Sequence, residues 1–340
     1  MSIVPTDSDR QINREELARA LAAERALASA PVSLDAISGA ELYDKQYPPR
    51  EFIVDGLIKR GDLVLLAGRP KSGKSWLLLQ MAQAVDTGAR FLGRETARAK
   101  VLFIALEDGE RRVHERLHIR GWRPAEAHFA FDLFPLGGAG LQQLKYAAQA
   151  FDVVIVDTLR TALGGMDEND NSQMGWVVQS LADFAHDADK VVVVSHHTRK
   201  GDATDAFELI RGAGAIRAAY DVGMLIQRKE KEPEAVLRFE SRDLQIEDMT
   251  IHFDPETGWR YEGDARRIEE IRAGRRVVQA LAELGDAQTA DAIAEHLGIS
   301  KQAAWQQLTK AERDGLVKRR TEHVDGARKP RDLWYLAQMT

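Results

Sequence analysis

Runs of five to seven mostly apolar residues alternate with helical stretches through the middle of the chain. Four such runs lie at residues 63–67, 101–106, 151–157 and 191–195. Short, continuous apolar runs of this kind are typical of strands that are buried on both faces. Because helical stretches separate them, the pattern predicts a mostly parallel sheet flanked by helices, which is the α/β class.

The segments on either side of this region have different patterns. Three strand-like runs at residues 222–227, 235–241 and 249–253 follow one another closely, which predicts antiparallel pairs on one edge of the sheet. Residues 12–29 have the spacing of an amphipathic helix, and a looser linker follows them. That helix docks either on a neighbouring subunit or on its own domain, and the sequence leaves both alternatives open.

The chain changes character after Gly263. Three helices are predicted, at residues 266–284, 289–297 and 300–314, and Ser300 is a good N-cap for the third. Two strand-like runs follow them and form a predicted hairpin with a basic tip. Three helices and a two-stranded wing predict a winged helix-turn-helix. The predicted domains are an N-terminal helix and linker at 1–48, an α/β domain at 49–263 and the winged helix at 264–340.

Composition narrows the possible functions. The 340 residues include no cysteine, which excludes a disulfide framework, a thiol nucleophile and a cysteine-based zinc site. No apolar run approaches the roughly 20 residues that span a bilayer, and the N-terminus lacks the pattern of a signal peptide, so we expect a cytoplasmic protein without a membrane partner. The net charge of −6 gives no overall attraction to nucleic acid, so any such binding must come from local patches.

A phosphate-binding motif lies directly after the first buried strand. The pattern G-x-x-x-x-G-K-[ST] is matched, and a predicted helix follows it. Backbone N–H groups and the helix N-terminus would bind the phosphates of ATP, Lys74 would reach the β- and γ-phosphates, and the Ser75 hydroxyl would join the shell of Mg²⁺. The candidate nucleotide-binding residues are Gly68, Arg69, Pro70, Lys71, Ser72, Gly73, Lys74, Ser75 and Trp76.

Carboxylates follow two of the other buried strands. Asp157 ends an apolar run, the Walker-B pattern in which a carboxylate orients Mg²⁺. Glu107 follows another run and is the preferred general base for the attacking water, with Asp108 as its rival and Glu110 as a weaker third candidate. Because ligands bind beyond the carboxyl ends of parallel strands, we expect these groups to meet the phosphate loop.

Two histidines and two arginines complete the candidate site. His196 and His197 follow the strand at 191–195, and His196 is predicted to face the γ-phosphate as a sensor. A structural role for this histidine is the alternative. An arginine from a neighbouring subunit could stabilise the transition state, and Arg242 and Arg211 are the two candidates. Either one could equally be a surface arginine.

These motifs, in this order, resemble the RecA-like ATPases and, within them, the hexameric replicative helicases of the plasmid RepA type. The resemblance rests on the phosphate loop, Glu107, Asp157 and the segment Ser195-His196-His197, and it covers roughly residues 50–260. It implies a homo-oligomeric ring, usually of six subunits, with ATP at the subunit interfaces and an arginine acting in trans. It also implies that single-stranded DNA is held by loops in a central channel.

By the same resemblance, the loops at residues 164–172 and 198–207 would face the DNA. The first is acidic, unlike a surface that follows phosphates, whereas the second carries Arg199 and Lys200. From Arg266 onward, 14 Lys and Arg residues stand against 11 Asp and Glu residues, a modest basic excess in an acidic protein. The candidate DNA contacts there are Lys301, Gln302, Gln306 and Lys310 on the third helix and Lys318, Arg319, Arg320, Arg328, Lys329 and Arg331 on the wing.

The favoured hypothesis is a Mg²⁺-dependent ATPase of the RecA-like ring type that acts on DNA, as a replicative helicase or related motor of a plasmid, phage or mobile element. A DNA-binding regulator that uses ATP as an assembly switch is the alternative. A recombination-type filament ATPase is the third hypothesis.

Overall fold

The computed structural model describes residues 36–166, 170–199, 205–210, 213–230, 232–285, 287–322 and 330–337. Residues 1–49 and 50–340 form two separate compact units. In the described part of the first unit, helix α2 (Gly39–Asp44) lies where the sequence predicted a linker. Ser38 accepts a hydrogen bond from the Glu41 amide, and the Glu41 carboxylate accepts one from the Ser38 amide, which forms a capping box. The helix predicted at residues 12–29 lies outside the described residues.

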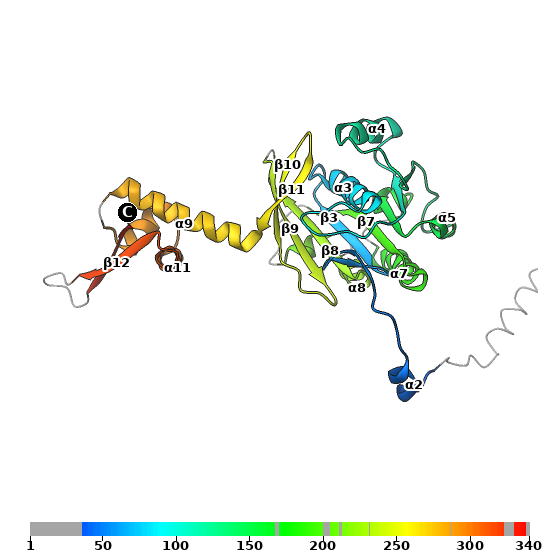
Figure 1. Ribbon diagram of the computed structural model, residues 1–340, viewed down its shortest axis with the longest axis horizontal. Coiled ribbons are helices and arrows are strands. Elements are labelled where there is room, and N and C mark those ends of the chain that lie inside the picture. Colours follow the sequence, from blue (N-terminus) through cyan, green and yellow to red (C-terminus); the bar gives the residue numbers. More distant parts are fainter. Residues whose placement is uncertain are drawn as a thin grey trace, which may run out of the picture. The chain divides into compact units, whose positions relative to one another are not determined.

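The described residues of the second unit contain a sheet with the strand order β11-β10-β9-β8-β3-β7-β6-β4-β5 (Figure 1). The first six in the chain pair in parallel: β3 (Leu63–Gly68), β4 (Val101–Ala105), β5 (His128–Ala130), β6 (Val153–Asp157), β7 (Val191–His197) and β8 (Val222–Arg228). The antiparallel strands are β9 (Glu234–Ser241), β10 (Met249–Asp254) and β11 (Gly258–Asp264). A small hairpin of β1 (Phe52–Val54) and β2 (Ile58–Lys59) precedes them.

The three strand-like runs after residue 220 form antiparallel pairs at one edge of the sheet, as predicted: β8 pairs with β9, and β9 pairs with β10. Strand β8 also pairs in parallel with β3, with Val64 opposite Val222, and so connects this edge to the parallel strands. The short helix α8 (Ala213–Ala219) returns the chain to the edge where the parallel strands begin, so β8 must run in their direction. Strand β11 was not predicted, because its sequence is mostly polar and glycine-flanked.

Helices cover both faces of the sheet (Figure 1). Helices α3 (Lys74–Thr87) and α4 (Glu110–Ile119) pack on one face; α5 (Gly140–Ala147), α6 (Leu159–Ala162), α7 (Asn171–Ala188) and α8 pack on the other. Alternate residues of a strand face opposite sides. In β7, Val191 and Val193 therefore join the core beneath α3, whereas Val192 and Val194 join the core beneath α7.

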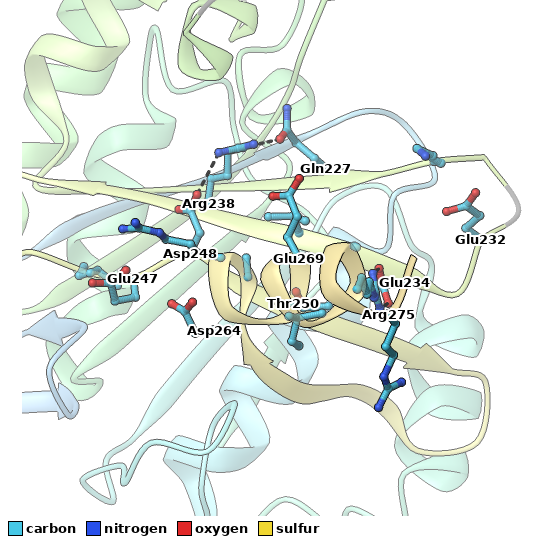
Figure 2. A pocket seen from close by; sticks show the side chains of 18 of the residues that line it. Gln227, Glu232, Glu234, Arg238, Glu247, Asp248, Thr250, Asp264, Glu269 and Arg275 are labelled. Carbon is cyan, nitrogen blue, oxygen red and sulfur yellow. Dashed lines mark hydrogen bonds and ion pairs between the residues drawn. The ribbon is translucent and has the colours of Figure 1, made fainter. Parts of the chain in front are cut away.

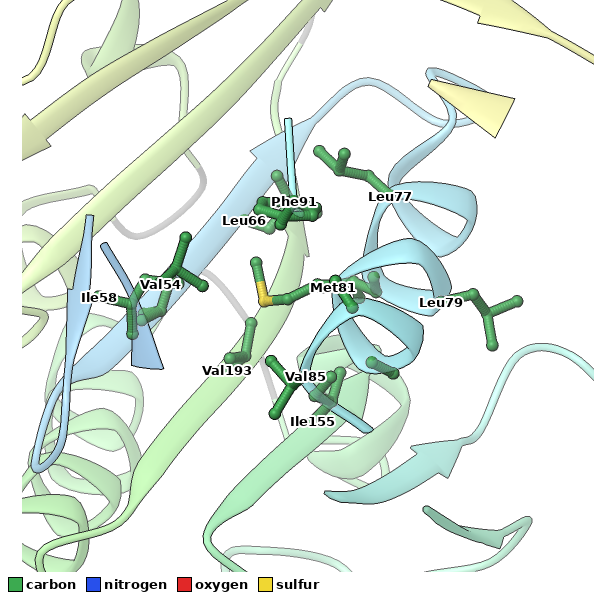
Figure 3. Packing of buried hydrophobic residues seen from close by; sticks show 14 of the residues in the cluster. Val54, Ile58, Leu66, Leu77, Leu79, Met81, Val85, Phe91, Ile155 and Val193 are labelled. Carbon is green, nitrogen blue, oxygen red and sulfur yellow. The ribbon is translucent and has the colours of Figure 1, made fainter. Parts of the chain in front are cut away.

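The core beneath α3 fixes the position of the phosphate loop. Leu77 and Met81 of α3 pack with Leu66 of β3, Ile155 of β6 and Val193 of β7 (Figure 3). Burial of each such aliphatic side chain contributes about 1.5–3 kcal/mol. The helix N-terminus is thereby held against the ends of three parallel strands.

The end of the chain forms α9 (Ala265–Leu284), α10 (Ala290–Leu297), α11 (Lys301–Arg313) and an antiparallel pair, β12 (Val317–Glu322) and β13 (Arg331–Leu336). Asp264, Thr289 and Ser300 each accept a hydrogen bond from an amide in the first turn, as N-caps do. These elements have their own core around Val277, Leu308 and Trp334. Their bounds agree with the predicted ones to within one or two residues. In the described part of the chain, no helix combines the length and apolar character needed to span a membrane.

Candidate ATP site

The phosphate loop connects β3 to α3 as predicted. Gly73, which immediately precedes α3, has a φ of 100°, a conformation that strongly favours glycine. A Cβ atom at Gly68 would lie 2.5 Å from Ile226 Cγ2, so this position also requires a residue without a side chain. The amide groups of the first turn of α3 have no earlier helical carbonyl to bind, and they form an anion site with the positive end of the helix dipole.

The side chain of Lys74 is held inside this loop. It is 5% exposed, and its Nζ donates to the carbonyl oxygens of Gly68 at 3.0 Å and Arg69 at 3.2 Å. Burial lowers the pKa of Lys74 to about 8, although the nearby carboxylates of Asp157 and Glu107 favour its charged form. A negative group beside Nζ would therefore be strongly favoured.

Strand β7 lies between β3 and β6 in the sheet and joins their two motifs. Ser195 Oγ on β7 donates to Asp157 Oδ1 at 2.5 Å. Burial raises the pKa of Asp157, and hydrogen bonds from Ser195 and from the Ser75 hydroxyl oppose that rise. The Ser75 hydroxyl and the Asp157 carboxylate thus meet, and these are the hard oxygen ligands that Mg²⁺ prefers. The donor set fits the predicted metal.

Glu107 is the carboxylate after β4 that faces this group. Its Oε1 accepts a hydrogen bond from Thr158 Oγ1 at 3.2 Å and lies 3.3 Å from His197 Nε2. Asp108, its rival, is instead buried in ion pairs with Arg112 and Arg116. Glu110, the weaker third candidate, is an exposed residue at the start of α4. Of the three, Glu107 has both contact with the site and a side chain that is 41% exposed.

The structure corrects the predicted histidine. His197 Nδ1 lies 3.2 Å from Lys74 Nζ, and His197 Nε2 lies 3.3 Å from Glu107, so His197 joins the two groups. His196 is fully buried. Both histidines are part of β7, whose alternation places Ser195 and His197 on the face that carries α3 and places His196 on the opposite face. If the strand is continued through His197, alternate residues share a face, and this rule could have grouped His197 with Ser195.

The two arginine candidates are not part of this cluster. Arg242 Nη1 lies 3.8 Å from Asp221 Oδ1, and Asp221 Oδ2 accepts from the amide of Leu63, the first residue of β3. Arg242 therefore lies at the edge where the parallel strands begin, opposite the edge that carries the phosphate loop of the same subunit. Arg211 lies outside the described residues. In the described part of the chain, no arginine forms a hydrogen bond or ion pair with Lys74, Glu107, Asp157 or His197.

Three other residues of the predicted nucleotide site differ in their surroundings. Arg69 and Lys71 are exposed on the loop. Trp76 packs its ring edge-on against Phe253 of β10, with 5.8 Å between the ring centroids, and the Arg116 guanidinium lies 5.3 Å from its ring centroid. Trp76 therefore faces the sheet edge and α4.

The candidate DNA contacts on α11 are of two kinds. Gln302 and Gln306 are exposed. The two lysines are held by acids, because Lys301 Nζ lies 2.7 Å from Asp291 Oδ2 and Lys310 forms an ion pair with Glu270. Of the four candidate DNA contacts on α11, the two glutamines are thus accessible, whereas the two lysines are already paired.

Fewer of the candidate DNA contacts on the wing and the loops lie in the described residues. Arg319 lies 3.7 Å from carboxylate oxygens of both Glu312 and Asp332, and Arg320 lies 2.9 Å from Glu322. Arg199 is exposed. The candidates outside the described residues are Lys200, Arg328 and Lys329, together with Asp167 and Glu168 of the acidic loop.

A groove of about 1050 Å³ lies away from this site, between the antiparallel strands and the start of α9 (Figure 2). Two of its arginines are held by neighbouring side chains: Arg238 contacts Gln227 at 2.5 Å and Asp248 at 3.0 Å, and Arg272 pairs with Glu234. It contains none of the phosphate-loop residues.

The chain is similar to a known protein family and to solved structures. Residues 29–203, just over half of the chain, match the family described as an AAA domain. A KaiC-like protein from the hyperthermophilic archaeon Pyrococcus horikoshii OT3 is similar in structure, with a TM-score of 0.46, 14% identity, and coverage of 62% of this chain and 93% of the archaeal one. No curated protein matches the chain. Because the family match covers just over half of the chain, this chain belongs to the AAA domain family, and its phosphate loop and mostly parallel sheet form the core of a P-loop ATPase.

Proposed function

We propose that this protein is a Mg²⁺-dependent ATPase of the ring type that acts on DNA, as a replicative helicase or related motor of a plasmid, phage or mobile element. The observation that carries the proposal is the convergence of Lys74, Glu107, Asp157 and His197 from separate elements at one edge of the sheet. This arrangement supports hydrolysis in addition to nucleotide binding.

In the proposed reaction, the phosphate loop holds ATP and Lys74 contacts its β- and γ-phosphates. Glu107 accepts a proton from water, whose oxygen attacks the γ-phosphorus as the bond to the β–γ bridging oxygen breaks, giving ADP and phosphate. His197 contacts both Lys74 and Glu107, and it is the better candidate for sensing the γ-phosphate. Mg²⁺, held by Ser75 and Asp157, would neutralise phosphate charge.

The same site supports the proposal of a homo-oligomeric ring. Phosphoryl-transfer sites of this kind commonly use an arginine against the transition-state charge. Within the described residues, the cluster has no such arginine, and Arg242 lies at the far edge of its own sheet. An arginine from a neighbouring subunit, Arg242 or Arg211, would complete the site in a ring, for which we propose six subunits.

The C-terminal elements support the proposed action on DNA. Three helices and a two-stranded hairpin form the pattern of a winged helix-turn-helix, with α11 as the recognition helix. Gln302 and Gln306 are one helical turn apart and exposed, as side chains that read base edges must be. The loop with Arg199 would contact single-stranded DNA in the channel.

A DNA-binding regulator with an ATP-driven assembly switch is the second candidate. It is favoured by the predicted channel loop at residues 164–172, which is acidic in sequence and whose Asp170 caps α7 by accepting from the Ser172 and Gln173 amides. A loop of this composition would repel a phosphate backbone.

The ATPase rate with and without single-stranded DNA, measured alongside the solution mass with ATP, distinguishes the two candidates. The motor requires stimulation by single strands and an assembly larger than a dimer. A chain that binds a specific duplex through α11 but shows no response to single strands would support the regulator. A monomer under all conditions would contradict the ring.

A further inference from the structure

A tryptophan distant in sequence lies against the phosphate loop. Trp259 of β11 is 2% exposed, and its indole Nε1 donates a hydrogen bond to the carbonyl oxygen of Gly73 at 3.1 Å. A Cβ atom added to Gly73 would lie 2.6 Å from Trp259 Cζ2. The indole ring therefore occupies the space that any side chain at Gly73 would need.

Trp259 is itself held from two sides. The Gln80 side chain of α3 donates to the Trp259 carbonyl oxygen at 2.6 Å and accepts from the Trp259 amide at 3.0 Å. On the ring, the Arg228 guanidinium lies 5.3 Å from one indole centroid, and the Phe253 centroid lies 5.0 Å away. These contacts fix both the backbone and the ring, so the indole N–H has a defined direction.

The Gly73 carbonyl oxygen belongs to the same planar peptide group as the amide of Lys74. A peptide plane cannot rotate about its C–N bond, so a hydrogen bond that fixes the carbonyl also fixes the opposite N–H. The Gly73 carbonyl also accepts the first helical hydrogen bond, from Leu77 N at 3.1 Å, and its two lone pairs accommodate both donors. The Lys74 amide is one of the groups that would face the phosphates.

We propose that Trp259 is a positioning residue of the ATP site, which holds the Gly73–Lys74 peptide group with its N–H directed at the bound phosphates. This inference rests on the proposed nucleotide site at Gly68–Ser75. Its effect is on ATP affinity rather than on the chemical step, because Trp259 contacts the loop and has no recorded contact with Glu107 or His197 in the described part of the chain.

The test is Trp259→Phe, which keeps an aromatic ring but removes the N–H donor. The expected result is a roughly two- to tenfold increase in both the Kd of ATP, measured by calorimetry, and the KM, with kcat changed by less than about twofold. Trp334→Phe is the matched control, because Trp334 is equally buried but its Nε1 has no hydrogen-bond partner among the described residues. The control should leave Kd and KM unchanged.

Two further variants keep the test decisive. Gln80→Met removes both hydrogen bonds to the Trp259 backbone while it preserves the indole, and it should raise the Kd of ATP without lowering kcat. Lys74→Met tests the site itself: if this variant binds ATP as well as the unchanged protein, the proposed nucleotide site is wrong. If Lys74→Met abolishes binding but Trp259→Phe and Gln80→Met leave Kd unchanged, the site stands and the positioning role of Trp259 is overturned.

Discussion

Lys74 at the phosphate loop and the basic side chains of the C-terminal helices and strands are held in opposite ways. Lys74 is buried, and its Nζ is bound by two backbone carbonyl groups and one histidine. Lys301, Lys310 and Arg320 are each paired with a carboxylate near the surface. Carbonyl groups are neutral, so they orient a charge without cancelling it, whereas a carboxylate cancels the charge that it contacts.

This difference indicates how each region would bind phosphate. The buried lysine is preorganised, and binding energy there depends on single groups whose replacement has large effects. Surface cations exchange one anionic partner for another, so each contributes little and the sum depends on salt. Variants that alter one group in each region test this contrast.

The largest effect is expected for Glu107→Gln. Loss of the proposed general base should lower kcat about 100-fold or more while leaving ATP binding intact, because the amide keeps the size of the side chain but cannot accept the proton. Single-turnover hydrolysis and calorimetric ATP binding are the measurements. Asp108→Asn is the matched control, since Asp108 is engaged by Arg112 and Arg116. If the two variants lose kcat equally, Glu107 is not the base.

A smaller effect is expected for His197→Asn. Removal of the ring that joins Lys74 and Glu107 should lower kcat about tenfold, less than the roughly 100-fold or more expected for the general base itself, because His197 contacts the base and does not accept the proton from water. His196→Asn, the neighbouring control, should alter thermal stability but not kcat per folded molecule. The reverse result would restore His196 as the sensor.

The effect of pH on ATP affinity is expected to be smaller again. With a pKa of about 8, Lys74 is mostly protonated at pH 7 and mostly neutral at pH 8.5, and a phosphate beside it favours the protonated form. ATP binding at pH 8.5 should therefore take up about 0.7 of a proton and be about fourfold weaker than at pH 7. Calorimetry in buffers of different ionisation enthalpy measures the uptake. Lys74→Arg keeps a positive charge that does not titrate in this range, so equal proton uptake by this variant would assign the proton to another group.

The smallest effect is expected on the C-terminal helices. Asp291→Asn removes the acid that pairs with Lys301, so that the lysine can contact a phosphate without losing a partner. Duplex affinity should rise only about twofold. The slope of log K against log[KCl] should become steeper by less than one unit. Fluorescence anisotropy over a range of KCl concentrations measures both. A rise in duplex affinity above about tenfold would contradict the expectation that a surface cation exchanges its carboxylate partner for a phosphate at little cost.

Much of the fold could be predicted because its strands are buried on both faces. The predicted apolar runs coincide with β3, β4 and β6 to within two residues, whereas β7 extends two residues beyond its predicted end, and the phosphate loop followed its strand as expected. The direction of β8 could not be predicted from its own sequence, since parallel and antiparallel strands of similar burial have similar composition. Strand β11 was missed because three consecutive residues, Arg260, Tyr261 and Glu262, are exposed and give the strand no apolar run or alternation.

The sequence motifs of the site could be predicted, but the contacts between side chains on different strands could not. Gly68, Lys74 and Asp157 occur in local patterns that a sequence displays directly. The roles of Ser195 and His197 depend on which face of β7 meets α3, and the first prediction placed both histidines beyond the strand end rather than inside it. Trp259 is 186 residues from Gly73 along the chain, and no local pattern connects the two.

The strand that carries Trp259 continues into α9 without an intervening loop, since β11 ends at Asp264 and Asp264 is the N-cap of α9. Binding of ATP at the phosphate loop is then thermodynamically linked to binding of any ligand by the C-terminal helices. A ligand of those helices that displaces β11 must change the affinity for ATP, and ATP must change the affinity for that ligand by the same factor. One indole ring would thus transmit the coupling between two sites that share no ligand.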